Sequence, residues 1–433
     1  MKTKTNLKII FLVLACLPLG LFAKSFQGVK IQAKLIGGQQ YERLYSRIKL
    51  WEDKTGAKVE IISKKSHFEL NKEIKSDIAA GTTSWCIGSN HTSFAPQYTS
   101  IYTDLRPLFS KKFLSGFNQG ILKASTINGK LEMLPRAQFD VRALYYQKSL
   151  YQSKKNQIAF LKKYGYALKP PKTWNQVKDQ AIFFSKFKNM YGTQFAGKDE
   201  ALVGTFYEFL ISDGGQMFDK NFNPTFDSKA GEKALQWFVD LYKAKAVPAG
   251  TVNYVWDELG QGFASGTIAI DFDWAGWAGY FSNPKDSKVA NNIGVIAPPK
   301  GSVRATGWSG THGFSITKQC KNKKAAASLI EFLTNDKSQL FESEGGSLPS
   351  RTRVWKILKQ KTLKSHNAFE IAKLKAYESA AKGAFGVPKT AKWDEVVNAM
   401  YPLLQKAILG DLSVKTALKQ AQKKVSAIMK SAY

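Results

Sequence analysis

The alternation of strand and helix patterns after the first two dozen residues most constrains the fold. Residues 29–36 (VKIQAKLI) alternate apolar and polar side chains as a strand does, and Gly37-Gly38 ends the run. Large apolar residues then recur at helical spacing as far as Gly56: Tyr41, Leu44, Tyr45, Ile48 and Trp51. A second strand pattern follows at 59–62. A strand, a helix and a strand within about 35 residues predict a βαβ unit of an α/β protein.

The length of the chain predicts two lobes or domains. The chain has 433 residues, and a single hydrophobic core rarely grows past ~250–300 residues. Hydrophobic residues make up 44% and charged residues 22% of the chain. This composition supplies enough apolar material for folded cores and excludes wholesale disorder.

The first 23 residues have the layout of a secretory signal. Residues 9–22 are free of charge, Ala23 ends the segment with a small side chain, and three lysines precede it: Lys2, Lys4 and Lys8. We therefore expect cleavage before Lys24 and export to the periplasm. Lipid attachment at Cys16 is the alternative, which the bulky Leu14 disfavours. No other run reaches the ~18 apolar residues that a membrane-spanning helix needs.

Two further properties leave alternatives open. Cys86 and Cys320 either pair in an oxidising compartment or remain buried thiols. The formal net charge of +31 is compatible with an anionic partner, but the lysines are spread over many helical segments and form no arginine-rich block interleaved with aromatic residues. We therefore expect a solvated basic surface and no nucleic-acid partner, with an anionic ligand as an open alternative.

Polar residues follow two predicted strands. Residues 84–87 are strand-like and lead into Gly88, Ser89, Asn90 and His91, and residues 267–270 lead into Asp271, Asp273, Trp274 and Trp277. Ligands of open α/β sheets bind beyond the carboxyl ends of strands, so both segments are candidate walls of a site. A plain turn and core packing are the alternatives. Side chains alternate along a strand, which places Asp271 and Asp273 on the face opposite Phe272 and Trp274.

No motif indicates a metal, a cofactor or a reaction. The four histidines are far apart in sequence and none is four residues from another: His67, His91, His312 and His366. The phosphate-binding loop pattern is absent. A glycoside hydrolase remains an alternative, because Asp271, Asp273 and Trp274 are suitable residue types, but a further carboxylate such as Asp140 or Glu258 would have to face the same cleft. We expect no enzyme, no metal and no cofactor.

Four segments occur in the order and spacing of one known family: NGKLEMLPRAQFDVRALYYQKSLY (128–151), PPKTWNQV (170–177), FASGTIAIDFDWAGW (263–277) and GWSGTHGFSITKQCKNKKAAASLIEFLTNDKSQ (307–339). Together they resemble the extracellular solute-binding proteins of bacterial ABC importers, of the maltodextrin- and glycerol-phosphate-binding type. The resemblance implies an α/β fold of the two-lobe periplasmic binding protein type (type II). Lobe one would hold residues 24–140 and 307–345, and lobe two would hold 141–306 and 346–433.

The resemblance also implies a function. The protein would hold a sugar or oligosaccharide between its lobes, and hinge closure would present it to the membrane permease. The alternative ligand is an anion such as a glycerophosphodiester, a phosphosugar or a uronate oligomer, which Arg136, Arg142 and His91 suggest. By position in the family's motifs, the ligand-binding residues would be Gly88, Ser89, Asn90, His91, Asp140, Arg142, Glu200, Asp273, Trp274, Gly307, Trp308 and Trp393.

Overall fold

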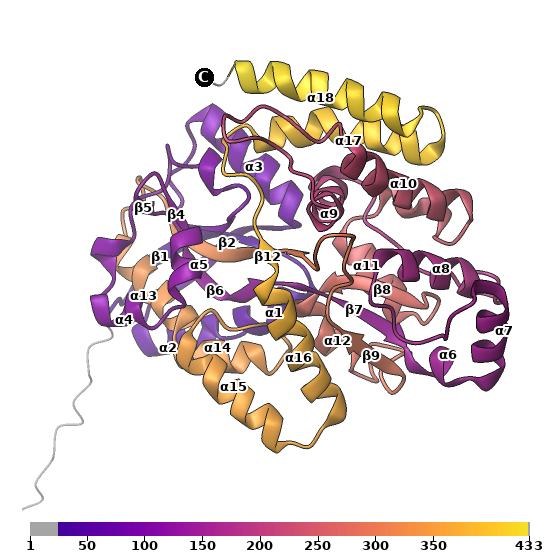
Figure 1. Cartoon of the computed structure of the whole chain (residues 1–433). Helices are drawn as coiled ribbons and strands as arrows, with labels where there is room; N and C mark the ends of the chain where they lie inside the picture. Colours follow the sequence, from indigo (N-terminus) through magenta and orange to yellow (C-terminus); the bar gives the residue numbers. More distant parts are fainter. Residues whose placement is uncertain (1–24, 432–433) are drawn as a thin grey trace, which may run out of the picture.

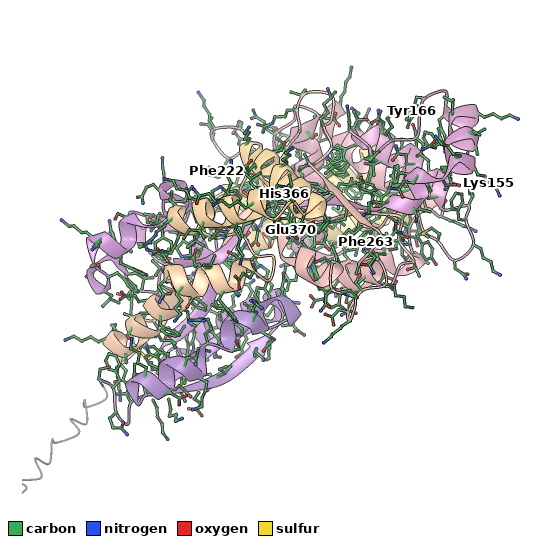
Figure 2. The ribbon with its side chains drawn as sticks, turned by 90° about the horizontal axis from the view of Figure 1, so that it is seen from below. Lys155, Tyr166, Phe222, Phe263, His366 and Glu370 are labelled. Atoms are coloured by element: carbon green, nitrogen blue, oxygen red, sulfur yellow. A yellow bond between two sulfur atoms is a disulfide. The ribbon has the colours of Figure 1, made fainter. Side chains whose placement is uncertain are left out.

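The computed structural model describes residues 25–431 (Figure 1). The predicted signal segment and Cys16 lie outside these residues. Within them, no helix combines the length and the hydrophobicity needed to cross a membrane. The described chain forms two bodies, seen side by side in Figure 2, which is the two-lobe architecture expected from the sequence.

The first lobe is built on a five-stranded sheet, at the left of Figure 1. Its strand order is β2 (Lys58–Lys65), β1 (Lys30–Ile36), β3 (Ile87–His91), β11 (Gly310–Ile316) and β6 (Leu134–Asp140). Strand β1 is parallel to β2 and to β3, whereas β11 is antiparallel to β3 and to β6. The expected βαβ unit is therefore present, and a strand from late in the chain completes the sheet.

The second lobe contains a three-stranded antiparallel sheet, at the right of Figure 1. Its order is β8 (Ile270–Trp274), β7 (Arg142–Gln147) and β9 (Ile293–Ile296). Strand β8 begins at the end of the predicted strand 267–270, so the DFDW segment is itself the strand. Its two aspartates and its two aromatic rings consequently lie on opposite faces of the sheet, as alternation predicts.

The chain crosses between the lobes at two places that position the site. Only Val141 separates β6 from β7, and only Ser309 separates β10 (Gly307–Trp308) from β11. Strand β10 pairs in parallel with β12 (Ala384–Phe385). The remaining two strands, β4 (Thr126–Ile127) and β5 (Lys130–Leu131), form the hairpin that Asn128-Gly129 predicts, with both turn residues at positive φ.

Helices cover both sheets. Those between residues 39 and 164 are α1 (Gln39–Tyr45), α2 (Ile48–Thr55), α3 (His67–Ala80), α4 (Lys111–Ser115), α5 (Gln119–Ala124), α6 (Lys148–Gln152) and α7 (Lys154–Tyr164). Those from 174 to 281 are α8 (Trp174–Phe184), α9 (Asp199–Ser212), α10 (Lys229–Lys243), α11 (Trp256–Ala264) and α12 (Ala278–Phe281). The C-terminal third adds α13 (Lys323–Thr334), α14 (Asp336–Ser343), α15 (Thr352–Lys364), α16 (Ala368–Lys382), α17 (Trp393–Leu409) and α18 (Val414–Lys430).

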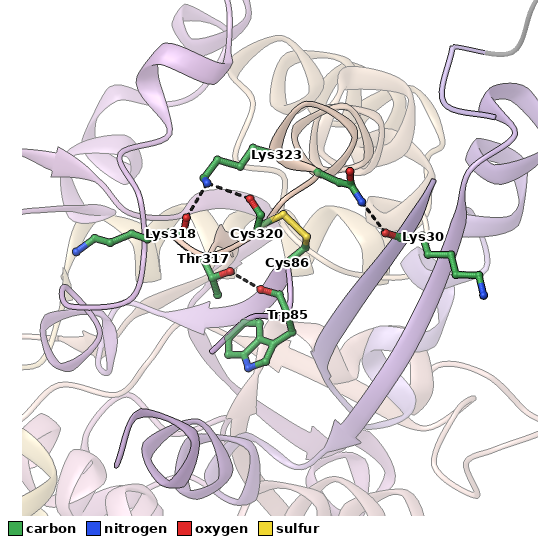
Figure 3. The surroundings of a disulfide bond; sticks show 8 residues. Lys30, Trp85, Cys86, Thr317, Lys318, Cys320 and Lys323 are labelled. Carbon is green, nitrogen blue, oxygen red and sulfur yellow. Dashed lines mark hydrogen bonds between the residues drawn. A yellow bond between two sulfur atoms is a disulfide. The ribbon is translucent and has the colours of Figure 1, made fainter. Parts of the chain in front are cut away.

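Cys86 and Cys320 form a disulfide in the first lobe (Figure 3). The bond joins the residue that precedes β3 to the segment that leads into α13. Hydrogen bonds support the same junction, because Lys323 donates to the carbonyl of Cys320 and Asn322 donates to the carbonyl of Lys30. Of the two alternatives left open by the sequence, the structure therefore has the paired one.

Candidate functional site

A small cavity lies between the lobes where the crossing strands meet. The first lobe contributes Gln40, Tyr41, His67, His91, Asp140 and His312, and the second contributes Glu200, Trp256, Trp274 and Trp308. Six of these ten residues stand at an end of their element. His91, Asp140, Trp274 and Trp308 end strands, and His67 and Trp256 begin helices. The free volume between the side chains is ≈40 Å³.

Three tryptophans form the second-lobe wall of the cavity. The ring centroids of Trp256 and Trp274 are 5.2 Å apart with an interplanar angle of 80°. Trp308 stands 5.3 Å from Trp274 and 5.7 Å from Trp256. Edge-to-face packing of this kind holds each ring rigidly, so the wall is a preformed apolar surface.

Arg142 supports this wall from behind and is not part of the cavity lining. Its guanidinium lies 5.3 Å from the ring centroid of Trp256 and 5.5 Å from that of Trp274, within cation–π range. The same guanidinium is 2.7 Å from a carboxylate oxygen of Glu208 and donates to the carbonyl of Phe272. Because Arg142 is buried and paired, it positions aromatic rings, in contrast to the expected direct contact with ligand.

Glu208 also fixes Trp308. The backbone N–H of Trp308 donates to Oε1 of Glu208 at 2.9 Å, and the indole packs against the α9 backbone at Gly204. A Cβ at residue 204 would lie 2.2 Å from the ring of Trp308, so only glycine leaves room for it there. The neighbouring Gly307 lies outside the cavity lining and pairs with Ala384 in the β10–β12 ladder.

Glu200 at the start of α9 links the two lobes. Its Oε1 accepts a 2.7 Å hydrogen bond from the indole N–H of Trp393, and its Oε2 is 3.8 Å from Nε2 of His67 in the first lobe. Trp393 is fully buried and does not line the cavity. The structure thus gives Trp393 the role of holding the Glu200 carboxylate, in place of the expected ligand contact.

Two histidines and one carboxylate converge on the first-lobe side. Nε2 of His312 is 3.4 Å from Oδ2 of Asp140 and 3.4 Å from the hydroxyl of Tyr41. The rings of His91 and His312 are 4.6 Å apart, and one ligand atom from each of His91, Asp140 and His312 lies within 4.8 Å of the others. Burial lowers the pKa of both His91 and His312 well below the usual value, so these imidazoles are neutral at pH 7.

Four other expected ligand residues lie away from the cavity. Gly88, Ser89 and Asn90 belong to β3 and not to a loop. The side chain of Ser89 accepts from the N–H of Ile36, and Asn90 donates to Ser315. Asp273 is fully buried on the opposite face of β8, where it accepts from the N–H of Trp274. Burial and the adjacent Asp271 raise the pKa of Asp273 well above its usual value. Both carboxyl groups are fully buried and neither lines the cavity, so this pair does not face a glycosidic bond held there.

Sequence reasoning missed five residues of the lining: Gln40, Tyr41, His67, Trp256 and His312. Gln40, Tyr41 and His67 follow the carboxyl ends of β1 and β2, so the rule that directed attention to His91 would also have found them. His312 lies in the segment 307–339 that carries part of the family resemblance. Trp256 begins the amphipathic helix α11 and carries no sequence signal of its role.

A larger groove of ≈750 Å³ lies on the other side of the second crossing, where its lining includes Ser309, Trp355, Glu378, Phe385 and Lys389. It has more room than the cavity. At one wall of the groove, Lys359 and Glu378 form an ion pair with each other. The smaller cavity combines a rigid aromatic wall with converging polar atoms from both lobes, as small-molecule sites do. We therefore take the smaller cavity as the candidate site.

Two lobes that are joined by crossing strands and enclose such a cavity define a two-lobe binding protein. The chain matches the bacterial extracellular solute-binding protein family over residues 33–340. It belongs to this family, and it is a solute-binding protein.

Particular relatives agree in fold. The maltose-bound MalE3 of T. maritima superposes with a TM-score of 0.80 at 26% identity, over 92% of this chain and 99% of that one. A solute-binding protein of Agrobacterium radiobacter in complex with ribitol gives a TM-score of 0.80 at 20% identity, over 93% of this chain and all of that one. In sequence, the chain is 25% identical to a probable amino-acid ABC transporter periplasmic-binding protein of Sinorhizobium fredii, over 72% of this chain and 70% of that one.

Proposed function

We propose that the protein captures a small uncharged carbohydrate, a monosaccharide or a polyol, between its lobes for an ABC importer, and that it catalyses no reaction. The observation that carries this proposal is the cavity with three rigid tryptophans on one side and Asp140, Glu200 and three histidines around it. Apolar faces of sugar rings stack on indoles, and carboxylates and imidazoles bond to hydroxyls. Relatives whose names specify maltose, ribitol and mannitol support the same ligand class.

The size of the cavity supports a moving cleft. Its ≈40 Å³ accommodate only a few water molecules, since one water occupies about 10–15 Å³ on this scale. A sugar therefore enters when the lobes separate, and the lobes then close on it.

Asp394 at the start of α17 stabilises closure outside the cavity. Its carboxylate accepts hydrogen bonds from three side chains of the first lobe: Asn71 at 2.7 Å, Gln97 at 3.1 Å, and Lys75. Within the described residues we divide the chain into a first lobe of 25–140 with 309–345 and a second lobe of 141–308 with 346–431. We take Ser309 as the return crossing because Trp308 packs in the core of the second lobe. Delivery of the ligand to a permease and export by the signal segment complete the proposal.

An anionic ligand is less compatible with the site. Arg136 is buried in an ion pair with Glu342, and Arg142 is buried in one with Glu208. The titratable groups of the lining are two neutral histidines, His67, Tyr41 and two acids. This set contains no lysine or arginine, which disfavours a phosphate or a uronate.

Calorimetric titration with ribitol, mannitol, tagatose and maltose tests the proposal. We expect at least one of the monosaccharide-sized ligands to bind and Trp274→Ala to weaken that binding about tenfold, the loss of one aromatic contact of about 1–1.5 kcal/mol. Trp355→Ala on α15, outside the cavity, is the matched control. Failure of every sugar and polyol to bind, together with binding of an amino acid or a phosphate ester, would refute the proposal.

A further inference from the structure

Three of the side chains that line the cleft are also of metal-ligand types and converge on one another. His91 ends β3, Asp140 ends β6, and His312 lies on β11 between these two strands in the sheet. Each of the three is more than nine-tenths buried, and all three line the same cavity. Across residues 25–431 no other group of three histidine, cysteine, aspartate or glutamate side chains converges in this way.

We propose that His91, Asp140 and His312 bind a divalent transition metal ion of the zinc type, with one coordination position open to the cavity. This inference goes beyond the proposed function and does not rest on it, because the metal and the sugar are separate ligands. Two imidazoles and one carboxylate around an ion, with a fourth position left open, form the ligand set of accessible zinc sites.

The distances fit this ion with a small adjustment. Zinc binds nitrogen and oxygen at about 2.0–2.1 Å, so two ligand atoms at a tetrahedral angle are separated by about 3.4 Å. Nε2 of His312 and Oδ2 of Asp140 are 3.4 Å apart. The ligand atoms of all three residues lie within 4.8 Å of one another, so a rotation of the His91 ring that brings its nitrogen toward the pair completes the triangle.

The surroundings support ligation by these residues. Tyr41 has its hydroxyl 3.4 Å from Nε2 of His312, where it can bond to Asp140 or to a group at the open position. His91 Nδ1 accepts the N–H of Ser93 at 3.2 Å, so ligation through Nε2 transfers the ring proton to Nδ1 and gives up this single contact. The ring of His67 stands 4.9 Å from His91 and 5.2 Å from His312, on the cavity side of the group.

The ligand types select the class of ion. Imidazole nitrogen suits zinc, copper, nickel and iron, whereas magnesium and calcium require mostly oxygen ligands. Two nitrogen donors out of three therefore exclude a magnesium or calcium site. The ion would also change the chemistry of the cleft, because its charge outweighs that of Asp140 and attracts a hydroxyl or carboxylate oxygen to the open position.

Titration of the metal-stripped full-length protein with Zn²⁺ alone, without any sugar, tests the inference. We expect one Zn²⁺ per chain by calorimetry, no binding of Mg²⁺, and the intense visible absorption of four-coordinate cobalt when Co²⁺ replaces Zn²⁺. His312→Ala and, separately, Asp140→Asn should each weaken Zn²⁺ binding by at least about 10–100-fold, the range known for loss of mere outer-shell partners of a metal. Circular dichroism establishes that each variant is folded.

The control is His366→Ala, which removes the histidine in the exposed turn before α16 that Figure 2 labels. This variant should bind Zn²⁺ as the native chain does. Equal Zn²⁺ affinities of the native chain and of folded His312→Ala and Asp140→Asn would overturn the inference, as would the absence of binding to the native chain. A protein that binds sugars and no Zn²⁺ refutes the metal site alone, and one that binds Zn²⁺ and no sugar refutes only the proposed function.

Discussion

Removal of the disulfide should destabilise the folded chain strongly. Cys86 and Cys320 are 234 residues apart in sequence, so the bond closes a very long loop in the unfolded chain. The chain-entropy relation of −2.1 − 1.5R ln n gives about 5 kcal/mol at 25 °C for a loop of this length, at the upper end of measured effects. We expect the free energy of unfolding of the Cys86→Ser/Cys320→Ser variant to be about 2–5 kcal/mol lower than that of the native chain, the range typical of native disulfides.

Urea unfolding followed by tryptophan fluorescence and by far-ultraviolet circular dichroism measures this difference. Residues 141–308 of the second lobe lie inside the loop that the bond closes, so the full loop entropy applies to the unfolding of the whole chain, and the transition should move to a lower urea concentration. Addition of a reducing agent should shift the native chain toward the double variant and leave the double variant unchanged. A double variant that unfolds at the native urea concentration would refute the entropic argument.

Three further predictions concern single residues. Glu132 is fully buried and burial raises its pKa to about 7, above the unfolded value, so its contribution to stability is present at low pH and is lost as pH rises from 4.5 through 7. Urea unfolding at pH 5 and pH 8 should show a loss of stability that is larger in the native chain than in Glu132→Gln by up to about 3 kcal/mol, because Glu208 and Asp271, whose pKa values are also raised to about 7, titrate in both proteins; equal losses in the two proteins would contradict it. Gly204→Ala should push the indole of Trp308 into the cleft and lower ligand affinity by about tenfold or more, since overpacking costs about 1–3 kcal/mol; calorimetry that finds native affinity would refute the packing argument. Asp394→Ala should reduce affinity about tenfold without touching the cavity, because a hydrogen bond to a charged group contributes about 1.5 kcal/mol to closure; an identical loss in the exposed control Glu395→Ala would argue against a specific role.

The elements with strong periodicity were predictable from the sequence. The βαβ unit occurs as expected. Two other elements carry local signals of the same kind: Asn128-Gly129 forms the turn of the β4–β5 hairpin, and Thr173 caps α8 by accepting from the N–H of Gln176. Local patterns suffice for these elements because each depends on residues within one segment. The sequence placed a strand at residues 84–87, whereas β3 spans Ile87–His91. The residues Gly88 to His91 looked like a loop because they are polar. They are buried in the strand, and burial of this kind is set by the tertiary structure.

The candidate site was only partly predictable. Two arguments pointed to His91, Asp140 and Trp274, which line the cavity. Ligands of open α/β sheets bind beyond the carboxyl ends of strands, and these residues stand in the motifs of the family. The sequence did not reveal that Arg142 is paired away from the cavity. Its partner, Glu208, is 66 residues away in sequence, and no local pattern connects the two residues. The convergence of His91 with His312 was likewise hidden, because a sheet that inserts β11 beside β3 joins residues that sequence spacing keeps apart.

The position of β11 in the first sheet has a consequence for biosynthesis. Strand β6 pairs with the sheet only through β11. Until synthesis has passed Ile316, the edge of β3 is therefore unpaired and β6 has no strand to pair with. Uncovered strand edges recruit other chains, and long-range pairings form slowly. The first lobe, although it begins the sequence, therefore completes its sheet only after the strands of the second lobe have been made. Through this interval the edge of β3 is open to pairing with other chains, and the nascent protein is then most prone to aggregation.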